Sequence, residues 1–276
     1  MKKYLDLVEQ VLTKGRRRAT SVQGVGNIVY AGAELRFKPA QEFPLITTRS
    51  LKGSWRAIVG ELLWFLSGSS DIKDLHQMGV RLWDAWATKE ICDQYGLPEG
   101  NLGRIYGPQW RAWRTTQGTT IDQITNLIGE IKERPDSKRM KVTAWNPEDV
   151  DQVFIAPCHG DFKCVVAEGV LDLCMVQRSA DLPIGVPFNI ASYSLLLLMI
   201  AQVTGLKPGE FVHQLQDIHI YENQVQVIKE QLTRELRPLP HVKLNPNVLD
   251  LFAFTIDDFT LEGYNPHPPL KIPVSV

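Results

Sequence analysis

The chain has 276 residues, of which 44% are hydrophobic and 22% charged, and its formal net charge is −1. This length and even composition predict a single globular domain over residues 1–276 with one large core. The small net charge disfavours a nucleic-acid surface as the main function, although a local basic cluster that binds a phosphate stays open.

The cysteine usage and the apolar runs indicate the cellular compartment. Four cysteines without a framework spacing, and an amphipathic N-terminal segment without a signal-peptide core, predict a cytoplasmic protein. The longest apolar run, residues 195–201, is far shorter than the roughly 20 residues of a membrane span. We therefore expect a buried helix there and no membrane partner.

The predicted elements mix helices and strands irregularly. In chain order, periodicity predicts a helix over 2–14, a mobile basic loop over 15–26, a strand over 28–37, and helices over 54–66, 72–78 and 120–131. Strands follow over 140–145, 162–167 and 170–177, and a helix over 189–204 packs on them. This mixture favours an α+β fold over a doubly wound sheet. No glycine loop cradles a phosphate, so any phosphate site must use side chains.

Cys158 is the candidate nucleophile. Arg178 and Asn189 follow it closely, which gives a thiol, a guanidinium and a carboxamide in one stretch. A thiol attacks as thiolate, and Arg178 is the cation that lowers its pKa if the two segments lie side by side. A buried, inert cysteine is the alternative, and it is the preferred interpretation for Cys164 and Cys174 in their apolar runs.

Two other cysteine chemistries are disfavoured. The intervals between the cysteines match no zinc pattern, and the adjacent Cys158 and His159 side chains point apart on an extended strand. We therefore expect neither a metal site nor a papain-like dyad.

Glu61 is the candidate carboxylate. It lies among the core-type residues 59–65 of a predicted helix, which leaves little room for an exposed polar stripe. We expect a buried or cleft-facing group with a raised pKa that relays protons or orders water.

Short segments along the whole chain resemble the thymidylate synthase family. They are Phe-Pro-Leu-Ile-Thr-Thr at 43–48, Glu-Leu-Leu-Trp-Phe-Leu at 61–66, Leu-Trp-Asp at 82–84, Tyr-Gly-Pro-Gln-Trp-Arg at 106–111, Asp-Ser-Lys-Arg at 136–139, Cys-His at 158–159, Arg-Ser at 178–179, Asp-Ile-His-Ile-Tyr at 217–221 and Gly-Tyr-Asn-Pro-His-Pro at 263–268. The resemblance implies an α+β subunit with a mixed sheet, helices on one face and a homodimer whose sheets pack back to back. It also implies transfer of a one-carbon unit from 5,10-methylenetetrahydrofolate, without a metal, to C5 of dUMP.

The resemblance assigns roles around the nucleotide phosphate and the thiol. Cys158 adds to C6 of the uracil, because C5 becomes a good nucleophile only after a thiolate has added to C6. Arg178 binds the phosphate while its charge favours the thiolate, and Ser179 adds a hydroxyl donor. Lys138 and Arg139 reach the same phosphate from the partner subunit.

The remaining implied roles concern the base, the sugar and the folate. The Asn189 amide pairs with O4 and N3–H of uracil, whereas family members that act on cytosine carry an aspartate there. Glu61 acts through water at O4 and Tyr106 helps to remove the C5 proton. The other implied substrate contacts are His219 and Tyr221 at the sugar 3′-hydroxyl, Ala180 and Asp181 in the nucleotide site, and Lys52, Trp83, Asp181 and Ser275 at the folate.

Departures from the family pattern leave alternatives open. A phosphate-binding arginine of the family aligns with Val22, for which the basic residues 16–18 can compensate. Altered residues at 50–52 and 160–163 allow a hydroxymethylase, in which water captures the intermediate to give 5-hydroxymethyl-dUMP. Trp83 and the tail over 271–276 favour methylation to dTMP instead, because both exclude water. An inactive paralogue that binds nucleotide or RNA is the second alternative, and ribose versus deoxyribose stays open.

Overall fold

The structure is a computed structural model that describes residues 1–21 and 24–275. Its helices are α1 Lys2–Lys14, α2 Trp55–Ser67, α3 Ile72–Gln77, α4 Lys89–Gln94, α5 Tyr106–Arg111, α6 Gln123–Glu133, α7 Gly185–Thr204 and α8 Val225–Leu232. Its strands are β1 Arg16–Arg18, β2 Asn27–Phe37, β3 Trp113–Arg114, β4 Thr120–Ile121, β5 Lys141–Val142, β6 Asp161–Ala167, β7 Val170–Asp181, β8 Lys207–Tyr221, β9 His241–Leu244 and β10 Phe259–Glu262. Short 3-10 turns, among them η4 Glu222–Gln224, join these elements.

A six-stranded sheet organises the fold, in the order β1-β2-β8-β7-β6-β5. The β7–β8 pair is parallel and is connected through α7, whereas the other neighbours are antiparallel. The pairs β3–β4 and β9–β10 form two small separate sheets. The α+β fold with a mixed sheet, predicted from the sequence, is therefore confirmed.

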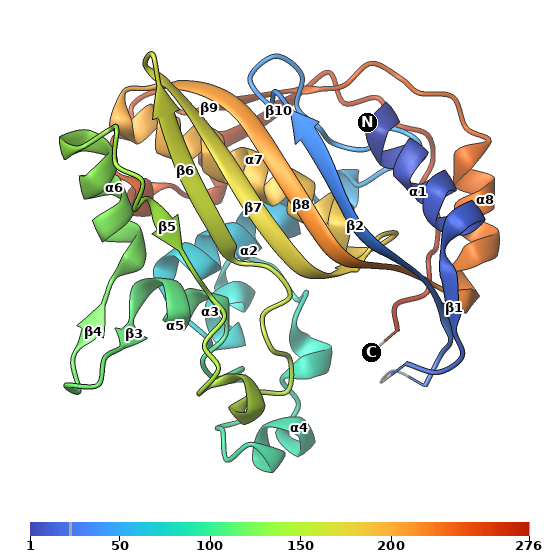
Figure 1. Ribbon diagram of the computed structural model, residues 1–276, viewed down its shortest axis with the longest axis horizontal. Coiled ribbons are helices and arrows are strands. Elements are labelled where there is room, and N and C mark those ends of the chain that lie inside the picture. The colour runs from blue at the N-terminus through green and yellow to red at the C-terminus, as the bar shows by residue number, and fades with distance from the viewer. Residues whose placement is uncertain (22–23, 276) are drawn as a thin grey trace.

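The core lies on one face of this sheet. Leu171, Leu173 and Met175 alternate along β7 with partly exposed residues, as expected for a strand covered on one side. Figure 1 shows α7 and α2 behind the sheet, while the front of β6, β7 and β8 carries no helix. Helix α7 is the one described helix that is long and apolar enough to cross a membrane, and 89% of its apolar window is buried inside the protein. It is a core helix, as predicted for residues 195–201.

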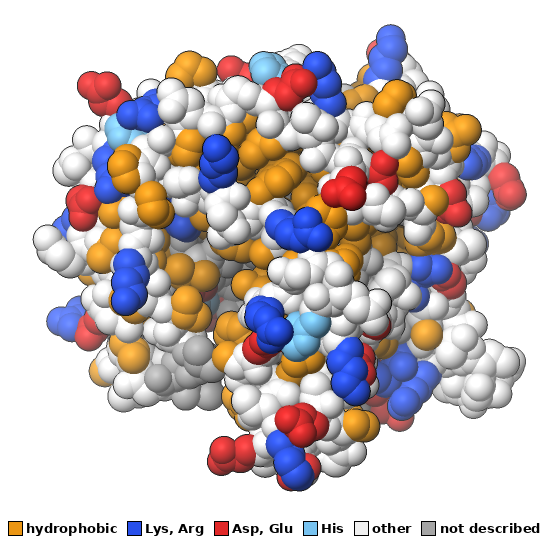
Figure 2. Space-filling view, turned by 180° about the vertical axis from the view of Figure 1, so that it is seen from behind, with side chains coloured by type: hydrophobic (Ala, Val, Ile, Leu, Met, Phe, Trp, Pro, Cys, Tyr) orange, Lys and Arg blue, Asp and Glu red, His pale blue; other side chains and the backbone are white. Residues whose placement is uncertain are grey.

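The rear of the molecule, on the side of the sheet that α2 and α7 cover, is mixed in charge (Figure 1 and Figure 2). Figure 2 shows hydrophobic side chains gathered near the middle of that face, with lysine, arginine and acidic side chains scattered around them. Charges of both signs are interspersed, so this face has no large field of one sign.

The basic segment after α1 differs from the predicted mobile loop. Arg16–Arg18 form strand β1, which pairs with the start of β2. Arg17 pairs with Glu222, and Arg18 Nη2 lies 3.0 Å from Asp217 Oδ2. The backbone pairing with β2 and these two ion pairs order the basic segment. Charged side chains on such an edge strand also discourage pairing with further strands.

Two predicted boundaries shift because side chains capture the backbone. Helix α6 begins after residue 122 rather than at 120, because the Asp122 carboxylate accepts the N–H groups of Ile124 and Thr125. The predicted strand over 140–145 shortens to β5. The Asp161 carboxylate accepts the backbone N–H groups of Ala144 and Trp145 and so ends the ladder there.

Candidate active site

The loop before β6 places Cys158 next to Arg178. Strand β6 pairs with β7 as far as Asp161 opposite Val176, and beyond that point the Cys158 carbonyl accepts the Arg178 N–H at 2.9 Å. The loop that carries Cys158 thus runs alongside β7 beyond the end of β6. The predicted juxtaposition of Cys158 and Arg178 is confirmed.

A glycine makes this loop possible. Gly160 has a φ of +107°, and a Cβ there would come within 2.6 Å of Ala144 Cβ. The Trp110 indole also donates to the Gly160 carbonyl at 2.9 Å. The turn between the thiol and β6 therefore requires glycine.

A cavity of about 600 Å³ opens in front of the thiol. It brings together five residues that the sequence analysis assigned to one site: Cys158, Arg178, Ser179, His219 and Tyr221. Its other walls include Arg18, Thr20, Asn27, Phe154, Ala156 and Asp217. The His219 and Tyr221 rings meet edge to face at the end of β8, with their centres 5.2 Å apart.

The Arg178 guanidinium has two functions in this wall. Its Nε donates to the Pro157 carbonyl at 2.7 Å and its Nη2 to the Ala156 carbonyl at 2.8 Å, which clamps the loop that carries the thiol. The guanidinium carbon lies 4.7 Å from the centre of the Trp145 ring. The cation is therefore held at the cavity by packing and by two carbonyls.

The thiol is less acidic than the sequence analysis expected. Burial raises the pKa of Cys158, and the Arg178 charge and the Ser179 hydroxyl oppose that effect without cancelling it. The correction follows from burial, because desolvation penalises the thiolate more than one guanidinium shared with two carbonyls stabilises it. The Arg178 charge alone therefore does not account for a thiolate at Cys158.

A layer of buried side chains lies beneath the thiol. The Tyr106 hydroxyl accepts the Cys158 backbone N–H at 2.9 Å, and the Trp83 ring lies 6.1 Å from the Tyr106 ring. The Trp83 indole N–H donates to Glu61 Oε1 at 2.8 Å. Burial raises the pKa of Glu61 to about 7, so the predicted buried carboxyl with a raised pKa is confirmed.

Asn189 joins this layer through a chain of hydrogen bonds. Gln177 Nε2 donates to Asn189 Oδ1 at 3.0 Å, and Asn189 Nδ2 lies 3.0 Å from His159 Nε2. His159 Nδ1 lies 2.9 Å from the Tyr193 hydroxyl. Both His159 nitrogens are thus used away from the thiol, although residues 158 and 159 lie in a bend and not on the predicted extended strand.

Three members of this chain of hydrogen bonds, Gln177, Tyr193 and His213, received no role in the sequence analysis. His213 Nε2 lies 2.8 Å from Gln177 Oε1. Polar residues at core positions of strands were the available signal, together with the spacing of four that puts Asn189 and Tyr193 on one face of α7.

The Gln224 side chain contacts both the C-terminal tail and Asp181. Gln224 Nε2 donates to the Pro273 carbonyl at 3.0 Å and lies 3.4 Å from Asp181 Oδ2. Burial raises the pKa of Asp181. Ile272 is buried, which anchors the tail, and the Ser275 hydroxyl is buried without a partner among the described atoms. Val276 and Val22 lie outside the described residues.

Four other predicted site residues lie away from the cavity in this chain. Lys52 is exposed at the start of a short 3-10 turn, and Ala180 is fully buried on β7. Lys138 and Arg139 are exposed in the turn before β5. Their contacts with nucleotide or folate stay predictions.

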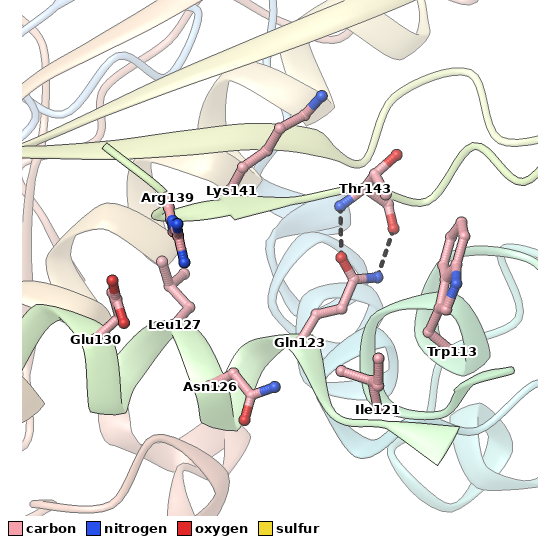
Figure 3. Close-up of a pocket in the computed structure, with 9 residues that line it drawn as sticks. All are labelled: Trp113, Ile121, Gln123, Asn126, Leu127, Glu130, Arg139, Lys141 and Thr143. Carbon is pink, nitrogen blue, oxygen red and sulfur yellow. Dashed lines mark hydrogen bonds between the residues drawn. The ribbon is translucent and has the colours of Figure 1, made fainter. Parts of the chain in front are cut away.

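Arg139 lines a separate groove of about 410 Å³ between α6 and β5. Figure 3 shows it above Leu127 and Glu130 of α6, while Gln123 pairs with the Thr143 backbone through two hydrogen bonds. Arg139 and Cys158 thus line different cavities of the chain.

One comparison with known proteins bears on this geometry. The family model described as thymidylate synthase matches residues 2–276, essentially the whole chain. That family transfers a one-carbon unit from methylenetetrahydrofolate to C5 of dUMP. A thiol beside an arginine, a serine hydroxyl, a histidine and a tyrosine in one cavity suits such a reaction on a nucleotide. The chain therefore belongs to the thymidylate synthase family.

Proposed function

We propose that the protein methylates dUMP reductively to dTMP, with Cys158 as the nucleophile. The observation that carries this choice is the enclosure of Trp83, whose side chain is 8% exposed and hydrogen-bonded to Glu61. A bulky indole packed against Trp86 and Tyr106 leaves little room for the water that hydroxymethylation needs.

The thiolate opens the reaction. Cys158 Sγ forms a bond to C6 of the uracil, and the electron pair of the C5–C6 double bond moves towards C5 and O4. C5 then accepts the one-carbon unit, and its proton leaves towards water held near Tyr106. Methylenetetrahydrofolate supplies that carbon and the hydride that completes the methyl group, and dihydrofolate leaves. Expulsion of Cys158 restores the C5–C6 double bond.

Glu61 and Asn189 act on the base. A carboxyl with a pKa of about 7 exchanges a proton near neutral pH, which suits a group that protonates and deprotonates O4 through water. The Asn189 amide has one donor and one acceptor left for the base after its contacts with His159 and Gln177. These two unused positions match O4 and N3–H of uracil.

Cations at the cavity wall bind the phosphate. Arg178 and Ser179 line it together, and we assign Arg18 to the same ligand because it lines the cavity from β1. The Arg18–Asp217 pair also neutralises a carboxylate that would otherwise repel the phosphate. Arg18 thereby takes the place of the arginine that the family pattern puts at position 22.

We further propose a homodimer through the open face of the sheet. Val165 and Trp145 are 43% and 38% exposed on the side without helices, and Trp145 packs against Arg178. Exposed apolar side chains on an uncovered sheet face favour a second copy as the cover. Back-to-back packing would also let Lys138 and Arg139 serve the partner's phosphate.

Product analysis tests the function. Incubation of the protein with dUMP and methylenetetrahydrofolate should give dTMP and an equal amount of dihydrofolate. Cys158→Ala should give neither and should form no covalent adduct with 5-fluoro-dUMP. Formation of 5-hydroxymethyl-dUMP without dihydrofolate would replace methylation by hydroxymethylation. Absence of product and adduct would leave the binding paralogue.

A further inference from the structure

His213 is a buried histidine that the proposed chemistry does not use. It is fully buried on the core face of β8, and its ring lies 5.4 Å from the Phe211 ring. Its Nε2 contacts Gln177 Oε1 at 2.8 Å, while its Nδ1 has no hydrogen-bond partner among the described atoms. Burial of the unpaired Nδ1 costs free energy, which an apolar side chain at this position would avoid. The contact from Nε2 to Gln177 is therefore the feature that a histidine provides here.

The backbone carbonyl of Ser179 fixes the direction of the whole chain. A carbonyl can only accept, so the Gln177 atom 3.0 Å from it is Nε2. Gln177 Oε1 therefore faces His213, and since Oε1 also only accepts, His213 Nε2 carries the proton. Burial lowers the pKa of His213 to about 3, which leaves the ring neutral with that single proton.

The same logic continues to the base-recognising amide. The second N–H of Gln177 donates to Asn189, so the Asn189 atom at 3.0 Å is Oδ1. Asn189 Nδ2 must then face His159 Nε2, which accepts, and His159 Nδ1–H donates to Tyr193. Each member has one orientation only, because reversal of any amide would put two donors or two acceptors face to face.

We infer that His213 is a positioning residue for base selectivity: together with the Ser179 carbonyl, its Nε2–H holds the Gln177 amide, and through it the Asn189 amide, in the orientation that fits uracil. The inference rests on the proposed function, in which Asn189 reads the base. Uracil offers an acceptor at O4 and a donor at N3, whereas cytosine offers the reverse pair. A reversed Asn189 amide would therefore suit cytosine.

Removal of the donor tests the inference. His213→Phe keeps a flat ring but leaves Gln177 Oε1 buried and unpaired, which loosens the preferred orientation of both amides. His213→Gln keeps an amide N–H near the position of Nε2 and should rescue. Ser194→Ala is the matched control, because Ser194 is fully buried on α7 and its hydroxyl has no partner among the described atoms.

The readout is the ratio of the dissociation constants for dCMP and dUMP, measured by quenching of tryptophan fluorescence. We expect His213→Phe to lower this ratio about tenfold, the effect of one unpaired buried acceptor. His213→Gln and Ser194→Ala should leave it within about twofold of the wild-type ratio. A loss of stability alone would weaken both nucleotides equally and would not change the ratio.

Histidine labelled with 15N gives a second measurement in the wild-type protein. The inference requires His213 to be the Nε2–H tautomer, and an Nδ1–H tautomer would overturn it even if His213→Phe fails to fold. An unchanged ratio in a folded His213→Phe protein would also overturn it. Wild-type protein that binds neither nucleotide, or prefers dCMP, would instead overturn the assignment of the site to dUMP, and the inference with it.

Discussion

Replacement of Glu61 by glutamine should stabilise the protein at high pH and disable it at every pH. The Glu61 carboxyl is 6% exposed and receives one hydrogen bond, from the Trp83 indole at 2.8 Å. Glutamine has nearly the same shape and keeps an oxygen that accepts this bond. The substitution therefore removes the titration of the side chain while it preserves the packing.

The size of the stability effect follows from the pKa. Burial raises the pKa of Glu61 from its ordinary 4.5 to about 7 in the folded protein. Between these values the folded state binds more protons than the unfolded state, so the free energy of unfolding falls as pH rises through this window. At 1.36 kcal/mol for each tenfold change in proton affinity, wild type should lose about 3 kcal/mol relative to Glu61→Gln between pH 4.5 and pH 8.

Urea denaturation of both proteins at pH 5, 6, 7 and 8, at equal protein concentration, measures this difference. Other titrating groups contribute equally to both proteins and cancel. Glu235→Gln, an exposed glutamate, is the control and should run parallel to wild type. Turnover of Glu61→Gln should fall by at least about a hundredfold, the usual loss for a proton-transfer group. A stability difference that stays constant from pH 5 to pH 8 would refute the buried, titrating carboxyl.

Two further substitutions test the cavity wall and the tail. Arg18→Ala should raise the Michaelis constant for dUMP about tenfold, since it removes a phosphate contact and unmasks Asp217. Arg17→Ala, which removes an exposed pair with Glu222, should not raise it, and equal effects of both would contradict a specific contact. Ile272→Ala should loosen the buried tail anchor and raise the Michaelis constant for the folate about tenfold without weaker dUMP binding. Val274→Ala, at a 52% exposed position of the same tail, is its control, and unchanged folate kinetics in Ile272→Ala would exclude closure by the tail.

Periodicity predicted the elements whose residues pack by local pattern. Helix α1, strand β2 and helix α7 lie where the apolar spacing put them, because each buries one face or all of its surface. Strand β1 escaped prediction because its residues are all exposed arginines, and its order comes from pairing with β2 and from two acidic partners. Long-range contacts of this kind have no signature in a local window.

The residues of the candidate site likewise include some that the sequence alone could indicate and others that only the fold brings together. Cys158, Glu61 and Asn189 could be chosen from the sequence because their chemical types stand out in their segments. The chain through Gln177 and His213 could not, since it depends on which atoms of three separate elements face each other across the core. The expected low pKa of the thiol was wrong for a related reason, because burial is a property of the fold and outweighs the cation that the sequence displays.

The site thus combines a charged cavity with a buried layer beneath it, in which the two histidines are neutral. The cavity holds Arg18 and Arg178, which suit a phosphate. In the layer, burial lowers the pKa values of His159 and His213 to about 3, so both rings are neutral and each hydrogen bond has a fixed direction. A neutral network of fixed direction can distinguish uracil from cytosine, which differ in donor and acceptor order but not in charge. A charged histidine would donate from both nitrogens and lose that discrimination. Burial therefore disfavours the thiolate of Cys158 but provides the conditions under which the base can be read.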